Sequence, residues 1–148
     1  MDGLTLALDA SAGSGTIAVL REAVVIAQRA VEMRSEEEER FLPAVIATLA
    51  DAGVALADCA RIVCGAGPGS FTSLRVVGAS AKGLAQGAGL PLFAVPSLAL
   101  IVGASADTMR ADTRWLVVLD ALRGERYVAL VRVGEGGSVV AYESLGLL

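Results

Sequence analysis

The residues best suited to chemistry stand in a glycine-rich turn between a predicted strand and a predicted helix. Residues 61–64, which are apolar after Arg61, favour a strand, and a helical pattern of small residues begins near Thr72. Backbone N–H groups and the positive end of a helix dipole converge at such a helix start, where they can bind an anion. The turn residues that could hold a phosphate or a carboxylate are Gly67, Gly69, Ser70 and Thr72.

The same turn also has a purely structural interpretation. Its glycines would then shape a sharp passage from strand to helix, and Ser70 or Thr72 would cap that helix. A P-loop lysine is missing, since Lys82 is the only lysine and stands well inside the helix. The motif therefore predicts an α/β protein and leaves both interpretations open.

The composition excludes several classes of function. The chain has 148 residues and no histidine, which rules out histidine-based acid–base chemistry, Ser-His-Asp triads and histidine-ligated metal sites. With a formal net charge of −4 and no basic run, the chain does not favour tight binding to nucleic acid. Cys59 and Cys64 are predicted to be free thiols in a reducing compartment. We expect neither a cofactor nor a bound metal.

The sequence gives no sign of a membrane or secretory segment. It opens on a predicted strand without a positively charged leader. No apolar run approaches about 18 residues without charges or glycines. We therefore expect a soluble, cytoplasmic protein.

Hydrophobic periodicity predicts two successive sheets. Residues 4–9, 14–21 and 23–32 read as an antiparallel meander. Strands and helices then alternate with short links, which implies parallel strands joined by right-handed crossovers. A second meander follows, and we place a boundary between two lobes near residue 110. The predicted elements after residue 60 are strands over 61–65 and 92–95, helices over 72–87 and 97–109, and strands over 115–120, 127–133 and 139–143.

A helix is predicted between the first meander and the strand at 61–65. Ser35 and Glu38 have the spacing of a capping box, and the glutamates 36–39 suit the start of a helix. Pro43 lies too deep for the first turn of a helix that begins at Ser35, so the regular helix either begins near Arg40 or is kinked. Its apolar stripe consists of Phe41, Leu42, Val45, Ile46 and Leu49, and Gly53 ends it.

Four segments together resemble the bacterial TsaB (YeaZ) family: LALDAS, RFLPAV, GPGSFTSLRVVGASAKGLA and VLDALRGERYVAL. The resemblance implies an α/β, actin-like (ribonuclease H-like) lobe over residues 1–110, with a mixed sheet and flanking helices. It implies a truncated, β-rich second lobe over residues 111–148. It also implies a non-catalytic scaffold subunit for tRNA N6-threonylcarbamoyladenosine formation.

The resemblance further implies specific partners. Members of the family pair with a TsaD-like catalytic subunit through the helices of the first lobe, and a TsaE-like ATPase joins through that complex. Alone, they form homodimers through a similar surface. On this chain the matching interface residues are Phe41, Val45, Leu49, Arg75, Gly78, Ala81 and Lys82.

Some positions depart from the family pattern. Ser73 stands where the family usually has glycine, and Gly78 falls one position later than usual. Ala10 replaces the usual threonine, and Glu37 stands near the place of a common histidine. The chain is also shorter than most members by several tens of residues.

A nucleotide-binding alternative uses the acidic strand ends. Kinase-like members of the actin-like superfamily place a metal-steering acid at the end of the first strand, where this chain has Asp9. Together with Ser11, the turn at 67–72 and Asp120, it would form the site of a small nucleotide-binding enzyme. The alternative, purely structural interpretation is that Asp9 and Asp120 are turn or cap residues. A third possibility is a domain that only self-associates.

The helix predicted over 72–87 contains residues that indicate a neighbouring surface. Glycine inside a helix costs about 0.5–1 kcal/mol, so Gly78, Gly83 and Gly87 indicate a close neighbour, either the sheet or a partner helix. Arg75, near the positive end of the helix dipole, indicates an acidic partner or an interface.

The second meander also needs another element to cover one of its faces. We expect Trp115 or Tyr127 to lie at that contact.

Overall fold

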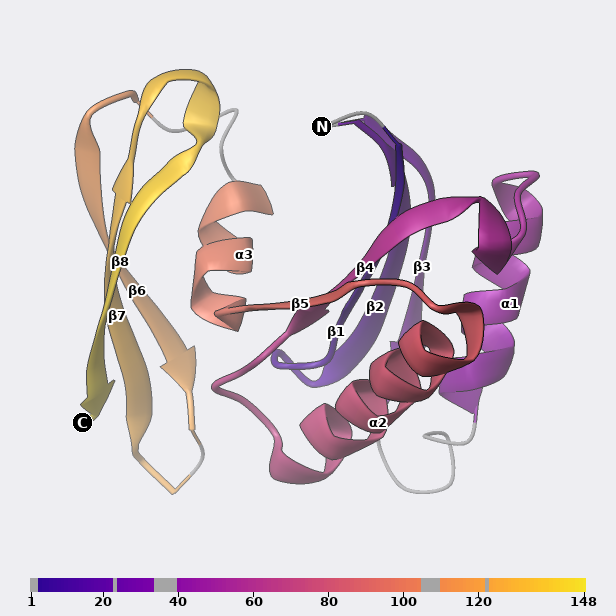
Figure 1. Cartoon of the computed structure of the whole chain (residues 1–148). Helices are drawn as coiled ribbons and strands as arrows, with labels where there is room; N and C mark the ends of the chain where they lie inside the picture. Colours follow the sequence, from indigo (N-terminus) through magenta and orange to yellow (C-terminus); the bar gives the residue numbers. More distant parts are fainter. Residues whose placement is uncertain (1–2, 23, 34–39, 105–109, 122) are drawn as a thin grey trace.

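The computed structural model describes residues 3–22, 24–33, 40–104, 110–121 and 123–148. Two β-sheets dominate it, and a short helix lies between them (Figure 1). The five-stranded first sheet has the order β3-β2-β1-β4-β5, and the three-stranded second sheet has the order β6-β7-β8. The first sheet contains β1 (Leu4–Asp9), β2 (Ser14–Arg21), β3 (Val24–Glu32), β4 (Cys59–Gly65) and β5 (Leu92–Val95).

The first sheet has the mixed topology that the sequence predicted. β1 and β2, and β2 and β3, pair in antiparallel fashion, whereas β4 pairs in parallel with both β1 and β5. The parallel strands are joined by helices, because parallel neighbours need a long crossover connection. The alternation of the apolar residues decides which face of each strand is buried.

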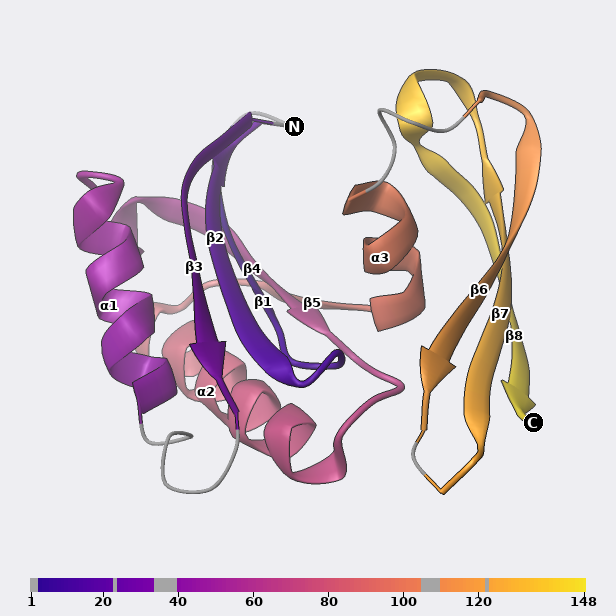
Figure 2. The ribbon, with the colours of Figure 1, turned by 180° about the vertical axis from the view of Figure 1, so that it is seen from behind.

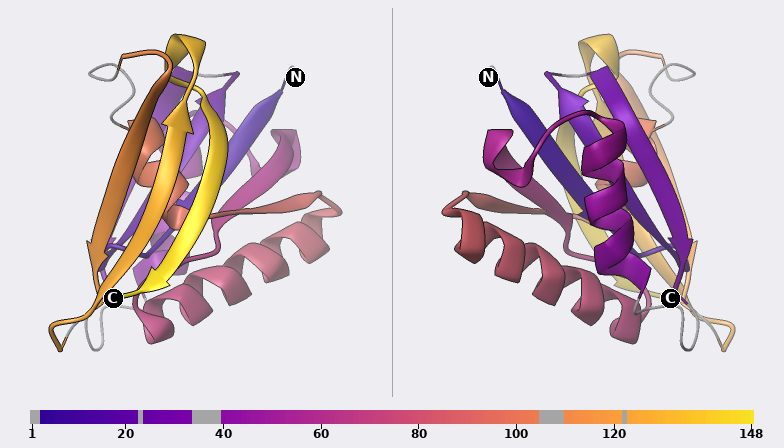
Figure 3. Two further views of the ribbon diagram at one scale, coloured as in Figure 1. Left: turned by 90° about the vertical axis from the view of Figure 1, so that its left-hand side faces the viewer. Right: turned by 90° about the vertical axis from the view of Figure 1, so that its right-hand side faces the viewer.

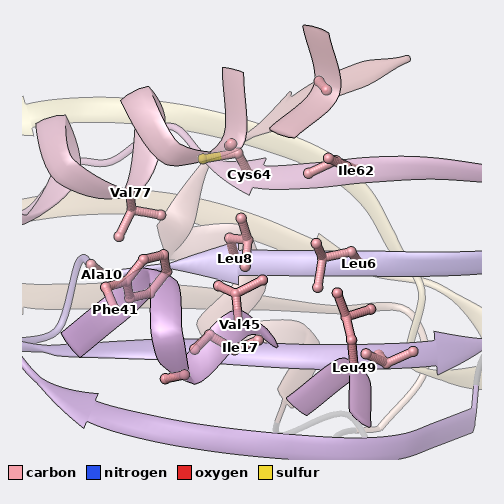
Figure 4. Packing of buried hydrophobic residues seen from close by; sticks show 14 of the residues in the cluster. Leu6, Leu8, Ala10, Ile17, Phe41, Val45, Leu49, Ile62, Cys64 and Val77 are labelled. Carbon is pink, nitrogen blue, oxygen red and sulfur yellow. The ribbon is translucent and has the colours of Figure 1, made fainter. Parts of the chain in front are cut away.

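Helices α1 (Phe41–Asp51) and α2 (Phe71–Ala88) cover one face of this sheet (Figures 1 and 2). Leu6 and Leu8 of β1 are buried and belong to the core in this layer. Aliphatic side chains fill most of the core, together with Phe41, as expected from a composition with 4% aromatic residues. Figure 4 shows Leu6, Leu8, Ala10, Ile17, Phe41, Val45, Leu49, Ile62, Cys64 and Val77 in this cluster.

The regular part of α1 begins late. The regular helix begins near Arg40, as one of the two alternatives predicted, since α1 begins at Phe41 after Arg40. Pro43 is therefore the third helical residue, where its missing N–H has no partner within the helix to lose. Gly53, with φ +67, follows the end of the helix as predicted. Ser35 and the glutamates 36–39 lie outside the described residues.

The second sheet consists of β6 (Thr113–Asp120), β7 (Arg126–Val133) and β8 (Val139–Leu147), all antiparallel. Its predicted strands are confirmed, and β8 extends four residues beyond the predicted end at Glu143. α3 (Ser97–Ala104) packs on one face of this sheet. Two single-turn 3-10 helices, η2 (Leu56–Asp58) and η4 (Glu135–Gly137), lie in connections.

α3, which precedes the predicted boundary near residue 110, packs with the second sheet. Leu98 and Val102 of α3 share a buried cluster with Val117, Ala129, Val131 and Val133 of the second sheet. The core of the first sheet, by contrast, contains none of the buried residues of α3. α3 thus supplies cover for the second meander, because a helix can bury its apolar surface against whichever sheet face lies beside it. Within the described part of the chain, no helix is long and apolar enough to cross a membrane.

Candidate functional site

Asp9, the strand-end acid of the predicted nucleotide site, is held by hydrogen bonds within the chain. Its Oδ1 accepts a hydrogen bond from Ser97 Oγ at 2.6 Å. Its Oδ2 accepts one from the Ser11 backbone N–H at 3.0 Å and one from Ser11 Oγ at 2.7 Å. The carboxylate therefore joins the end of β1, the turn after it and the first residue of α3. Asp9 thus has the contacts of a turn residue, the structural alternative predicted for it, and in addition a hydrogen bond to a helix distant in sequence.

Ser97 continues this network into the glycine-rich turn. Its Oγ accepts a hydrogen bond from the Gly67 N–H at 3.0 Å, and its own N–H donates to the Gly67 carbonyl at 2.8 Å. Ser97 is completely buried. The Gly67 N–H, one donor of the predicted anion cradle, is thus bound inside the protein.

Two glycines make room for this network. A Cβ on Gly65 would stand 1.7 Å from Asp9 Oδ1, and one on Gly69 would stand 2.5 Å from the Ser11 Cα. Real Cβ atoms do not approach other atoms so closely, so the Asp9 carboxylate and the turn fit only against glycine. Gly65 is the last residue of the strand predicted over 61–65, but its contact with Asp9 has no signal in the sequence.

The start of α2 differs from the predicted cap. Ser70 is the N-cap residue, as one interpretation had it, but its hydroxyl does not bond to the helix backbone. It lies 3.0 Å from Ser73 Oγ, which in turn lies 3.5 Å from the Met33 carbonyl. Ser73, where the family usually has glycine, is buried and lies within hydrogen-bond distance of the residue that follows β3. Thr72 is exposed.

One hollow of about 560 Å³ brings part of the predicted nucleotide site together. Ser11, Gly69, Ser70 and Asp120 line it, with Tyr127 from the second sheet. Asp9 lies instead beside a groove of about 680 Å³ between the first sheet and α3. Gly67 and Thr72 line neither. Tyr127 thus lies where the two halves meet, as predicted, whereas Trp115 donates to the Thr113 hydroxyl at 2.8 Å.

The predicted interface residues of α1 need correction. Phe41, Val45 and Leu49 lie in the core of the first sheet, at most 7% exposed, so they are not available to a partner. The apolar stripe of α1 is wide enough to reach from the core to the exposed surface of the helix. Its other members, Leu42 and Ile46, are 43% and 63% exposed. The sequence showed one apolar face, but only packing could divide it between core and surface.

On α2, some of the predicted interface residues are buried and others are exposed. Ala81 is buried against the sheet and needs the same correction, whereas Arg75 and Lys82 are exposed and Gly78 is half-buried. A Cβ on Gly78, Gly83 or Gly87 would meet no atom within 4 Å. The sheet therefore does not require these glycines. Arg75 has no acidic partner among the described contacts; its guanidinium lies 5.2 Å from the ring centre of Phe71, which is 74% exposed.

The two cysteines are free and buried. Burial raises the pKa of the Cys64 thiol, and the negative charge of Asp9 raises it further. Burial, and then the charge of Asp58, raise the pKa of the Cys59 thiol. Both side chains are therefore neutral thiols at pH 7. In the described part of the chain, no three acidic or cysteine side chains come together as a metal site would require.

Comparison with known proteins decides the family. Residues 31–144 match the TsaD family model, described as tRNA N6-adenosine threonylcarbamoyltransferase. The chain belongs to this family. Within it, the chain is 35% identical over 131 residues to the tRNA threonylcarbamoyladenosine biosynthesis protein TsaB of Bacillus subtilis, and 35% over 132 residues to that of Escherichia coli. An uncharacterized protein of Mycobacterium tuberculosis H37Rv is 39% identical over 126 residues.

These alignments cover 88%, 89% and 84% of this chain but only 56%, 56% and 57% of the relatives, so the chain spans about half of their length. YeaZ from Pseudomonas aeruginosa superposes with a TM-score of 0.82 at 29% identity, over 99% of this chain and 68% of that one. The predicted TsaB (YeaZ) resemblance is thereby confirmed.

The fold class is confirmed as well. ROK hexokinase from Thermus thermophilus superposes with a TM-score of 0.57 at 17% identity, over 93% of this chain and 48% of that one, and shows the fold alone. The mixed sheet with flanking helices is thus the predicted actin-like lobe. That the second lobe is a truncated one stays a prediction.

Proposed function

We propose that this chain is a non-catalytic scaffold subunit in tRNA N6-threonylcarbamoyladenosine formation, where it supports a TsaD-like catalytic subunit. Its relatives named TsaB support the pathway. The observation that supports a non-catalytic role is the set of hydrogen bonds to the Asp9 carboxylate. Among the described residues, the hydrogen bonds to its carboxylate come from Ser11 and Ser97, so it joins parts of the fold rather than pointing at a ligand.

The surface of α2 supports association with that subunit. Gly78 costs helix stability, and a Cβ at this position would meet no described atom outside the backbone of its own helix within 4 Å. A partner helix that approaches this surface would compensate for the cost. Phe71, Arg75 and Lys82 are exposed and, by helical spacing, lie on the same side of α2 as Gly78. Leu42 and Ile46 of α1 are exposed as well. The same surface would serve a homodimer when the chain is alone, and a TsaE-like ATPase would join only the complex.

Complementation tests this proposal. The chain is expressed in a strain depleted of its own TsaB, and threonylcarbamoyladenosine is measured in hydrolysed tRNA by mass spectrometry. Restored modification, with co-purification of the TsaD-like subunit, is the expected result. Unchanged loss of the modification, with the chain expressed and folded, would contradict the proposal.

The absence of intrinsic catalysis has a separate test. The isolated chain should neither bind ATP tightly in the presence of magnesium nor hydrolyse it, as judged by isothermal titration and phosphate release. Turnover that is lost in Asp9→Asn would favour the alternative, a small nucleotide-binding enzyme that uses the hollow beside Asp120.

A further inference from the structure

Ser97, the first residue of α3, holds the start of that helix to the ends of two strands. Its Oγ donates a hydrogen bond of 2.6 Å to Asp9 Oδ1 at the end of β1. Two bonds join it to Gly67, just past the end of β4: its Oγ accepts from the Gly67 N–H at 3.0 Å, and its N–H donates to the Gly67 carbonyl at 2.8 Å. Because hydrogen bonds are directional, bonds to two separate points fix the orientation of the helix start as well as its place.

The surroundings of Ser97 leave little room for another position. Its side chain is completely buried. A Cβ on Gly65 would stand 2.8 Å from Ser97 Oγ, closer than real Cβ atoms approach other atoms. A displaced Ser97 would also leave the buried Gly67 N–H and the Asp9 carboxylate without these hydrogen bonds, which is unfavourable. The start of α3 is therefore held in one place.

α3 and the second sheet form one unit that follows the direction set at Ser97. Leu98 and Val102 of α3 lie in the same buried cluster as Val131 of the second sheet, whereas the core of the first sheet contains none of the buried residues of α3. Figures 1 and 3 show α3 between the two sheets. α3 has eight residues. It is about 12 Å long, so a tilt of about 20° at Ser97 would move its far end, and the sheet packed on it, by about 4 Å.

The width of one hollow depends on this angle. The hollow has a volume of about 560 Å³, with Gly69 and Ser70 of the glycine-rich turn in its lining and Asp120 and Tyr127 of the second sheet opposite them. Since the two sides of its lining belong to different units, a tilt of α3 would widen or narrow it, as in a hinge between two lobes.

We infer that Ser97 is a positioning residue: through Asp9 and Gly67 it fixes the angle between the first sheet and the unit formed by α3 and the second sheet, and with it the width of the hollow. Ser11 offers a comparison within the same network. Its N–H and Oγ also donate to the Asp9 carboxylate, but Ser11 belongs to the turn after β1 and makes no link to α3 through these bonds. Both serines stabilise the network, and only Ser97 sets the angle.

The test measures one distance across the two units in the full chain. Spin labels are attached at Gln86→Cys on α2 and at Arg132→Cys on β7, which are exposed positions. The background is Cys59→Ala/Cys64→Ala, so that only the two introduced thiols react. Double electron–electron resonance then gives the distribution of distances between the labels.

We expect one narrow distribution in the labelled chain without further changes. In Ser97→Ala it should shift or widen by about 4 Å or more, the displacement given by a tilt of about 20°. Asp9→Ala should have the same effect, and the double variant should add little, because both substitutions remove the same link. Ser11→Ala is the matched control, which should lose stability in urea denaturation while its distance stays unchanged. Circular dichroism confirms that each variant is folded.

Three results would overturn the inference. A broad distribution before any substitution in the network would mean that the two units have no fixed angle, and this result does not depend on the folding of a variant. An unchanged distance in folded Ser97→Ala or Asp9→Ala would mean that other contacts set the angle. An equal change in Ser11→Ala would mean that the distance follows the stability of the fold and not the link to α3.

Discussion

Ser97 Oγ donates a hydrogen bond of 2.6 Å to Asp9 Oδ1, across 88 positions of sequence. It ties the end of β1 to the first residue of α3, the helix on which the second sheet packs. The same hydroxyl oxygen accepts a hydrogen bond from the Gly67 N–H. One side chain thus connects the first strand, the glycine-rich turn and the second half of the chain.

Replacement of Ser97 by alanine should therefore destabilise the protein. It would leave the Gly67 N–H and one oxygen of Asp9 without these partners, at a cost of about 1–3 kcal/mol in the free energy of unfolding. Urea denaturation measures that cost. The matched control is Ser138→Ala, because the exposed Ser138 donates only to the Glu135 carbonyl. Equal effects of the two substitutions would show that the Asp9–Ser97 bond contributes nothing special.

Two glycines should respond to alanine in opposite directions. In Gly65→Ala the new Cβ would meet Asp9 Oδ1 at 1.7 Å, so the carboxylate must leave its position and the network must open. In Gly83→Ala on α2 the new Cβ meets nothing within 4 Å, and the helix should gain about 0.5–1 kcal/mol. Melting temperatures should fall for the first variant and rise for the second. A Gly65→Ala protein as stable as the native one would contradict the close approach of Asp9.

The buried thiols should make stability depend on pH above the ordinary thiol pKa of 9.0. Because burial raises the pKa of Cys59 and Cys64, the folded state favours their protonated forms. This contribution is fully present below the pKa of the unfolded chain and is lost as the pH rises through the raised values. The free energy of unfolding should decline over that alkaline range. The comparison is with Cys59→Ala/Cys64→Ala, whose free energy of unfolding should decline less over the same range.

An arginine at Gly78 should block association without unfolding the chain. The site is open in the monomer, so the new side chain has room, but a partner helix could no longer approach α2 closely. We expect native circular dichroism, loss of binding to the TsaD-like subunit in a pull-down, and a monomeric mass in sedimentation. Ser138→Arg on the far hairpin is the control. If Gly78→Arg binds and associates like the native chain, the association surface lies elsewhere.

The local elements of this protein follow from the sequence. Alternating apolar residues predicted the strands of both meanders, and Gly53 marked a helix end, because these signals act within a few residues. Pro43 limited α1 to a regular start near Arg40 or a kink there, since proline is tolerated only in the first turn of a straight helix. The motif from Gly67 to Ala85 indicated the family, which the match over residues 31–144 confirmed.

Only the tertiary structure decided how these elements use their side chains. A helical stripe shows that a face is apolar but not what covers it, so Phe41, Val45 and Leu49 went to the core while Ile46 stayed exposed. The sequence left Asp9 either a turn residue or a ligand-binding acid, and only the tertiary structure shows its hydrogen bond with Ser97. Hydrogen-bond partners so far apart in sequence leave no local pattern, because the contact exists only after the sheet and α3 have packed.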